Sequence, residues 1–98
     1  TKVMHFVENK HVIKDNLFPT PVLFEMIQRE SGTDWKEMYK VFNMGHRLEV
    51  YLPADKAAEV IAISESFGIP ARIVGRVEER KEGNLLTIKS SKGTFEYL

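Results

Sequence analysis

The chain has 98 residues, of which 43% are hydrophobic and 29% charged, with 14 basic and 14 acidic side chains and no cysteine. This composition predicts one soluble globular domain and argues against disorder, and the missing cysteines exclude disulfides, thiolate catalysis and cysteine-based zinc sites. A formal net charge of zero argues against an electrostatic interaction with nucleic acid or an anionic membrane, and leaves room only for a local patch.

The chain begins at Thr1, without a methionine or a signal-type segment. Such a start fits either a processed N-terminus or a fragment of a longer protein, and we favour the fragment. No apolar run approaches the roughly 20 residues that a membrane-spanning helix needs.

The first 14 residues allow two interpretations. Residues 3–7 and 11–14 can form a hairpin about Asn9 and Lys10, or the first part can be a short helix after a loop. Residues 16–21 (NLFPTP) carry two prolines and predict a turn-rich linker.

A first longer helix is expected after this linker. Thr20 followed by Pro21 is typical of an N-cap and a first helical position, because the missing proline N–H would have no partner there. The helix is expected to end near Glu30, before Ser31 and Gly32. Its apolar stripe consists of Leu23, Phe24 and Ile27.

The stretch 34–45, DWKEMYKVFNMG, predicts a second helix that packs beside the first on a shared face of a sheet. Thr33 or Asp34 can cap its N-terminus, and Glu37 stands where a capping box requires it. Four apolar residues at i, i+3, i+4 and i+7 share one helix face: Trp35, Met38, Tyr39 and Phe42.

The end of this second helix is a candidate ligand site. Gly45 can adopt the left-handed conformation that ends a helix, which places Asn43 and Met44 at or just before the exit. Asn43 and the free backbone N–H groups near Gly45 would then lie at a rigid corner. The alternative for Asn43 is purely structural, because asparagine tolerates left-handed dihedrals and bonds local backbone.

Downstream of the corner, residues 47–52 alternate between apolar and polar side chains and predict a half-buried strand. A helix is expected over 55–67, ended by Gly68 and Pro70, and a further strand over 72–77. This strand–helix–strand order predicts a crossover unit with parallel strands.

The C-terminal part predicts an antiparallel extension of the sheet. Residues 78–83 (EERKEG) are expected to form a charged hairpin tip. Two strands over 84–89 and 94–98 follow, joined by the turn SSKG at 90–93. The expected fold class is therefore α/β (α+β), with a mixed sheet and helices packed on it.

The common catalytic and metal-binding motifs are missing from the sequence. The histidines His5, His11 and His46 are scattered and form no H-E-x-x-H ligand set, so we expect no metal site. There is no glycine-rich phosphate loop and no nucleophile elbow. Taken alone, composition and spacing indicate an α/β domain and no particular chemistry.

Residues 37–45, EMYKVFNMG, resemble the E-M-Y-x-x-F-N-M-G stretch of the phosphoribosylformylglycinamidine cyclo-ligase family, also called aminoimidazole ribonucleotide synthetase. Residues 21–30 resemble that family's P-x-L/V-F-x-x-I-Q-x-E helix, and residues 71–77 resemble its A-x-x-I-G-x-V ending. The resemblance extends from Phe18 to Val77.

This resemblance implies that residues 1–98 are a single domain, the C-terminal portion of the cyclo-ligase second domain, without the N-terminal ATP-binding domain. It implies a cytoplasmic, homodimeric parent enzyme that converts formylglycinamidine ribonucleotide to aminoimidazole ribonucleotide with ADP and phosphate. ATP and magnesium would be bound mainly by the absent domain. The implied substrate-binding residues are Asn43, Met44 and Gly45, and no side chain is assigned as catalytic. The fragment alone is expected to be inactive.

The sequence departs from the family before the matched region and within it. Of the family's T-E-N segment only Thr1 matches, and His46 and Arg47 stand where members commonly have a small or aliphatic residue and then glycine. The tail after Val77 lies outside the resemblance. The alternative hypothesis is a non-catalytic ligand-sensing or dimerisation module with a ferredoxin-like sheet.

Overall fold

The computed structural model describes all residues of the chain except Arg47. In chain order its helices and strands are η1 (Lys2–His5), β1 (Lys10–Lys14), α1 (Val22–Ser31), α2 (Trp35–Val41), η2 (Ala54–Lys56), α3 (Ala57–Ser66), β2 (Gly75–Glu79), β3 (Leu85–Ser90) and β4 (Gly93–Tyr97). None of the described helices is long and apolar enough to cross a membrane.

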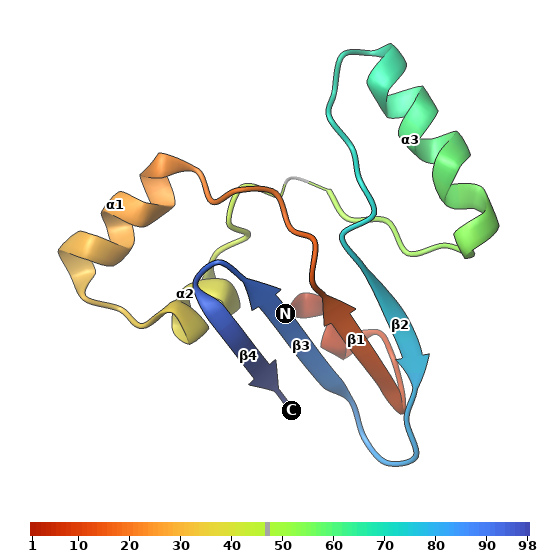
Figure 1. Cartoon of the computed structure of the whole chain (residues 1–98). Helices are drawn as coiled ribbons and strands as arrows, with labels where there is room; N and C mark the ends of the chain where they lie inside the picture. Colours follow the sequence, from red (N-terminus) through yellow and green to blue (C-terminus); the bar gives the residue numbers. More distant parts are fainter. Residues whose placement is uncertain (47) are drawn as a thin grey trace.

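The strands form one mixed sheet in the order β2-β1-β3-β4 (Figure 1). The central strands β1 and β3 are parallel, and each has an antiparallel neighbour at the edge, β2 beside β1 and β4 beside β3. The predicted mixed sheet with helices is confirmed, as is the hairpin of β3 and β4 around Ser91 and Lys92. The element order differs from that of a ferredoxin-like domain, because three helices follow β1 before the next strand.

The parallel pair in the sheet is not the predicted one. Residues 48–52 form no strand, and Arg47 lies outside the described residues. Leu48 is 83% exposed, whereas Glu49 turns inward and its carboxylate accepts a hydrogen bond from Lys14 Nζ at 2.7 Å. The expected burial of Leu48 and Val50 is therefore wrong, and so is the crossover between residues 47–52 and 72–77.

The charged segment 78–83 is not a hairpin tip. Glu78 and Glu79 are the last residues of β2, and residues 80–83 lead toward β3, which is separated from β2 in the sheet by β1. The Asn9 carbonyl accepts from the Arg80 N–H at 2.8 Å, and Asn9 Oδ1 accepts from the Gly83 N–H at 2.8 Å. The start of β1 thus fills the space between the two strands. Of the two interpretations of the N-terminus, the short helix is confirmed and the hairpin is wrong, because η1 precedes β1.

The core lies between the sheet and α2. Met38 and Leu86 are completely buried, and they meet Val12 from the neighbouring strand. Burial of such a side chain contributes about 1.5–3 kcal/mol. The core cluster consists of Val12, Met38, Tyr39, Met44, Leu86 and Ile88.

The N-terminus of α2 is capped as the sequence predicts, since Asp34 Oδ1 accepts from the Glu37 N–H at 2.9 Å. The sequence predicted that α2 ends further along the chain than it does. The helix stops at Val41, and Phe42 is already extended, with φ −109° and ψ 152°. Residues 43–45 lie outside the helix, and both Met44 (φ 56°) and Gly45 (φ 93°) take left-handed dihedrals.

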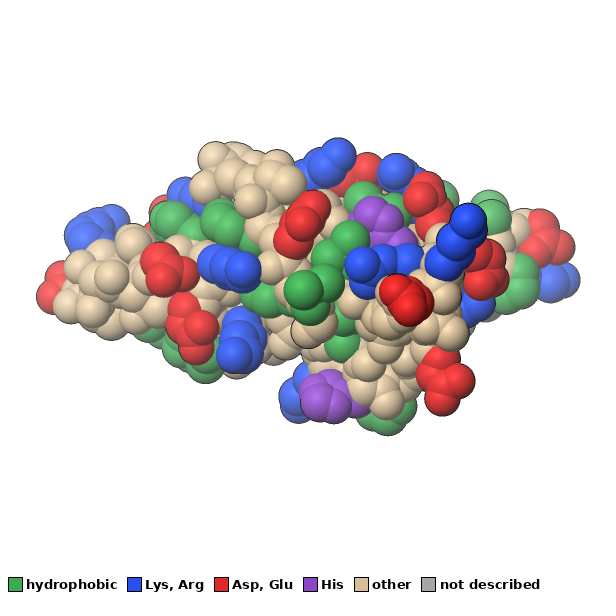
Figure 2. All heavy atoms as spheres, turned by 90° about the horizontal axis from the view of Figure 1, so that it is seen from below, with side chains coloured by type: hydrophobic (Ala, Val, Ile, Leu, Met, Phe, Trp, Pro, Cys, Tyr) green, Lys and Arg blue, Asp and Glu red, His purple; other side chains and the backbone are tan. Residues whose placement is uncertain are grey.

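Helices α1 and α3 reach away from the sheet, so α1 and α2 do not share a sheet face as predicted (Figure 1). Helix α1 touches the core with Phe24 and Ile27, while α3 has no buried residue. The molecule is flat, with principal extents of 41 × 40 × 20 Å. On the face shown in Figure 2, acidic and basic side chains are interspersed rather than gathered by sign.

Candidate functional site

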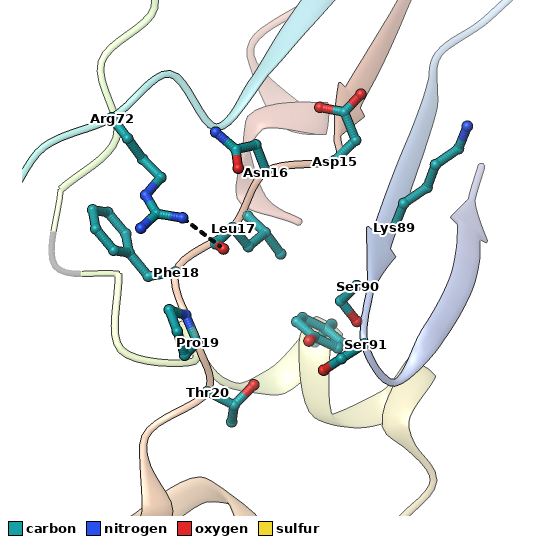
Figure 3. Close-up of a pocket in the computed structure, with 11 residues that line it drawn as sticks. Asp15, Asn16, Leu17, Phe18, Pro19, Thr20, Arg72, Lys89, Ser90 and Ser91 are labelled. Atoms are coloured by element: carbon teal, nitrogen blue, oxygen red, sulfur yellow. Dashed lines mark hydrogen bonds between the residues drawn. The ribbon is translucent and has the colours of Figure 1, made fainter.

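An open pocket of about 610 Å³ lies between the segment after β1 and the β3–β4 hairpin (Figure 3). Tyr39 of α2 and Arg72 complete it. Pockets that bind small molecules typically have volumes of about 300–1,000 Å³. The lining residues are Asp15, Asn16, Leu17, Phe18, Pro19, Thr20, Tyr39, Arg72, Lys89, Ser90 and Ser91.

The first wall of the pocket, residues 15–20, is fixed by the segment that precedes β2. The backbone N–H groups of Asp15 and Asn16 both donate to the Val74 carbonyl, at 3.1 and 3.0 Å. Asn16 Nδ2 donates to the Ile73 carbonyl at 2.7 Å. An ion pair of 3.1 Å between Arg76 and Asp15 adds to this attachment. Although it contains prolines, this linker is therefore held in one position and forms a fixed wall of the pocket.

Arg72 and Phe18 form one end of the pocket. The guanidinium carbon of Arg72 lies 4.2 Å from the centre of the Phe18 ring, a cation–π contact. Arg72 Nη1 also donates to the Leu17 carbonyl at 3.4 Å, as the dashed line in Figure 3 marks. On its other side the Phe18 ring meets His46 in an edge contact, with ring centroids 5.5 Å apart.

The predicted site residues Asn43, Met44 and Gly45 lie behind this wall and not in the pocket lining. Asn43 is exposed, and its Oδ1 accepts from the Gly45 N–H at 2.9 Å, so the backbone donor expected to be free is bonded. Met44 is buried in the core. Their role in substrate binding stays a prediction.

Gly45 packs directly against the pocket wall. A Cβ atom at this position would lie 2.6 Å from Pro21 Cγ, closer than real side chains approach, and φ is +93°. Only glycine combines this backbone conformation with such a close approach. The corner after α2 therefore sets the position of Pro21 and, through it, of Thr20 in the pocket.

A charged cluster lies beside the same corner. Lys14 Nζ and Glu49 Oε2 form an ion pair of 2.7 Å, and the Tyr51 hydroxyl donates to the same carboxylate at 3.1 Å. Burial raises the pKa of Glu49, but the hydrogen bond and charge of Lys14 outweigh it, so its pKa lies below the ordinary value. Burial lowers the pKa of His46, whose Nδ1 is 3.7 Å from Glu49 Oε1 and whose side chain is only 8% exposed.

We expect stability to fall as the pH decreases from 7 toward 5, and His46 to carry part of this loss. Because its pKa is lower in the folded state than the ordinary 6.5, the unfolded chain binds more protons below neutral pH, and stability rises with pH there. Near His46 lie the carboxylate of Glu49 and the cations of Lys14 and Arg72. The urea midpoint of His46→Gln should vary less over this range than that of the unchanged chain.

The matched control is His5→Gln, at an exposed histidine of η1. This variant should keep the full pH dependence. Identical slopes for the two variants would show that His46 does not carry the loss, and Glu49 cannot replace it in this range, since its contribution is lost only when the pH falls through its lowered pKa.

Several lining residues could hardly be predicted from the sequence. Thr20 was expected to cap α1, but the residue at the N-cap position is Pro21 and no side chain caps the helix. The Thr20 side chain points into the pocket instead (Figure 3). Arg72, Ser90 and Ser91 lie far from Thr20 in sequence. The polar turn at 90–93 indicated a turn at Ser90 and Ser91, and no sequence signal singled out Arg72.

Fold and site together define a small α+β domain with an open pocket of mixed polar and apolar lining beside a helix-end corner. Residues 9–87 match the family described as AIR synthase related protein, C-terminal domain, and the chain belongs to this family.

Proteins named phosphoribosylformylglycinamidine cyclo-ligase are similar to this chain. The protein of Anaeromyxobacter sp. is 38% identical over 68 residues, which cover 68% of this chain and 20% of that protein. The protein of Methanococcus vannielii is 37% identical over 68 residues, covering 69% of this chain and 20% of its own length. That of Methanocaldococcus jannaschii is 33% identical over 84 residues, 85% of this chain and 22% of its own length. The matched region thus spans about a fifth of these relatives.

Proposed function

We propose that this chain provides the C-terminal domain part of an ATP-dependent cyclo-ligase. The reaction would convert formylglycinamidine ribonucleotide to aminoimidazole ribonucleotide, with ADP and phosphate as the other products. The observation that carries the proposal is the position of the EMYKVFNMG stretch: Tyr39 lines the pocket, and Gly45 packs against Pro21, the residue that follows Thr20 of the pocket wall. The family match and the names of the relatives support it.

In this proposal the chain binds and orients the substrate. Holding the two reacting ends of one molecule close together removes much of the entropic cost of ring closure. Asn43, Met44 and Gly45 would lie on the substrate side of a cleft that another domain completes. The Asn43 amide offers its Nδ2 donors there, because its Oδ1 is bonded to the Gly45 N–H.

ATP and magnesium would be bound mainly by an N-terminal domain outside this chain. Among the residues that the structure describes, no three His, Cys, Asp or Glu side chains are placed to hold a metal ion. The only carboxylate in the pocket lining, Asp15, is paired with Arg76. These residues do not fit a magnesium site.

The proposal is tested by steady-state kinetics of the complete protein that carries this chain. Asn43→Ala should lower the rate of aminoimidazole ribonucleotide formation about tenfold, the effect of losing one hydrogen bond to a charged group. Its free energy of unfolding should change by no more than about 1 kcal/mol, as for a lost cap. The 98-residue chain alone should give no product.

The matched control is Asn43→Asp, which keeps the oxygen that accepts from Gly45 and removes the Nδ2 donors. It should be as slow as Asn43→Ala but at least as stable. Normal kinetics with a large loss of melting temperature would make Asn43 purely structural. A complete protein that forms no product, with every domain folded, would refute the function.

A further inference from the structure

Strand β2 lies at one edge of the sheet, with β1 on its inner side and no described strand on its outer side (Figure 1). Residues 76–79 of this strand are exposed, and Val77 is 45% exposed although it stands opposite the core residue Val12. An edge strand presents free backbone donors and acceptors to which another strand can be added. The outer side of β2 is therefore a candidate interaction surface.

Hydrogen bonds at the two ends of β2 show which of its backbone groups point outward. At one end the Val74 carbonyl accepts from the Asp15 N–H. At the other end the Arg80 N–H donates to the Asn9 carbonyl. Both bonds continue the register of the β1–β2 pair, in which inward and outward groups alternate along the strand. The outward N–H and C=O groups, which make no hydrogen bond within the described part of the chain, belong to Gly75, Val77 and Glu79.

The charges of β2 make the strand complementary to itself. When two copies lie antiparallel and are centred on Val77, Arg76 of each copy stands directly opposite Glu78 of the other. These residues lie between hydrogen-bonded pairs, where opposite side chains of antiparallel strands approach most closely. The side chains of Arg76 and Glu78 are 56% and 51% exposed, so both can reach a second chain.

Within one chain Arg76 already forms ion pairs, at 2.9 Å with Glu78 and at 3.1 Å with Asp15. These pairs engage Nε and Nη1, whereas a guanidinium has five N–H donors, so Arg76 can also bond the Glu78 carboxylate of a second copy. Glu79 meets no like charge in this arrangement, because the residue opposite it is Gly75. Pairing of two copies therefore adds contacts and keeps those of the single chain.

The opposite edge of the sheet is not self-complementary. Glu96 is the only charged residue of β4. In an antiparallel pair of two β4 strands centred on Phe95, Glu96 would face Thr94, and no ion pair would form. Charge complementarity thus favours β2 over β4 as the edge at which a second copy binds.

We propose that two copies of this chain pair through β2 and form a two-fold symmetric dimer with one continuous sheet. Val77 lies at the symmetry axis and exchanges backbone hydrogen bonds with Val77 of the second copy, as Gly75 does with Glu79. Arg76 and Glu78 form two equivalent ion pairs across the axis. The same surface serves both copies, as in other two-fold symmetric homodimers. This dimer does not depend on the proposed function.

The first test is sedimentation equilibrium of the 98-residue chain, which measures the dissociation constant of the dimer. Arg76→Glu and Glu78→Arg should each weaken the dimer at least about tenfold, because each change places like charges opposite one another on both sides of the axis. An equimolar mixture of these two variants should form a heterodimer about as tight as the dimer of the unchanged chain, since every charge again faces an opposite one. The double variant should recover the dimer for the same reason.

The second test is Val77→Pro, which removes an outward N–H and leaves the hydrogen bonds to β1 intact. This variant should be monomeric, with the circular dichroism spectrum of the unchanged chain. The matched control is Glu96→Arg on β4, which should leave the dissociation constant unchanged. A second control, Val60→Asp, places a charge among the exposed apolar residues of α3 and should also leave it unchanged.

Several results would overturn the β2 dimer. One is a chain that stays monomeric at about 1 mM. Another is a dimer that keeps its affinity in both charge variants, and a third is a pair of monomeric charge variants that form no heterodimer when mixed. Loss of the dimer only in Val60→Asp would assign the interface to α3 instead.

Discussion

Replacing Gly75 with alanine should destabilise the chain by about 3 kcal/mol or more, the range of overpacking in a rigid environment. An added Cβ would lie 1.9 Å from the Ile13 carbonyl oxygen and 2.9 Å from the Lys14 Cα. Both are backbone atoms of the central strand β1, which cannot move aside without breaking its pairing with β2, where Lys14 stands opposite Gly75. The measurement is urea unfolding followed by circular dichroism.

Gly68→Ala is the control, since Gly68 has φ +74° but no atom within 4 Å of an added Cβ. It should cost about 1 kcal/mol, the price of left-handed dihedrals for a residue with a Cβ. Equal losses in the two variants would show that β1 and β2 separate easily at this end. In Gly75→Ala the amide signals of Asp15 and Asn16 should also shift, because both donate to the adjacent Val74.

Met38→Ala should cost about 2–5 kcal/mol, as expected for truncation of a fully buried methionine. The side chain is 0% exposed and lies in the cluster between α2 and the sheet, against Val12 and Leu86. The loss includes the cavity, because the sheet beneath α2 cannot collapse onto a smaller residue. Thermal and urea unfolding should both report it.

Met26→Ala provides the same change of side chain at a site that is 51% exposed on α1. Its effect should stay within about 0.5 kcal/mol, as for most surface substitutions. If Met26→Ala were as costly as Met38→Ala, burial would not explain the loss in Met38→Ala. The comparison therefore separates the effect of burial in the core from that of the side-chain change itself.

The sequence predicted best where neighbouring residues decide the structure. The apolar spacing of Met38 and Tyr39 defines the buried face of α2, and both are core residues. The Asp34 cap depends only on a donor three positions later. The β3–β4 hairpin likewise follows from alternation on both sides of a polar turn. In each case the sequence pattern that decides the structure lies within a short stretch of the chain.

Long-range pairing could not be derived in this way. Alternation over 48–52 indicates that one face of the segment can be buried, but it does not supply a neighbouring strand. Here Lys14 attracts Glu49, and the apolar side chains of Leu48 and Val50 remain exposed. Similarly, no local pattern shows that β1 separates β2 from β3.

The candidate site also contains residues that a local sequence pattern could predict and residues that it could not. The sequence singled out Asn43 and Gly45, whose helix-end pattern is recognisable, and the structure places them behind the wall. Thr20, Arg72 and Ser91 became neighbours only through folding. A lone threonine, arginine or serine in a polar segment carries no local signal of such convergence.

The position of β1 in the sheet determines when the chain can fold during its synthesis. Lys14 pairs with Gly75 and His11 with Leu85, so both neighbours of β1 are made long after β1 itself. Closing such long loops is entropically costly and slows folding. As the ribosome advances, β1 must stay unpaired while the three helices emerge, and the sheet can assemble only when the last quarter of the chain has left the exit tunnel.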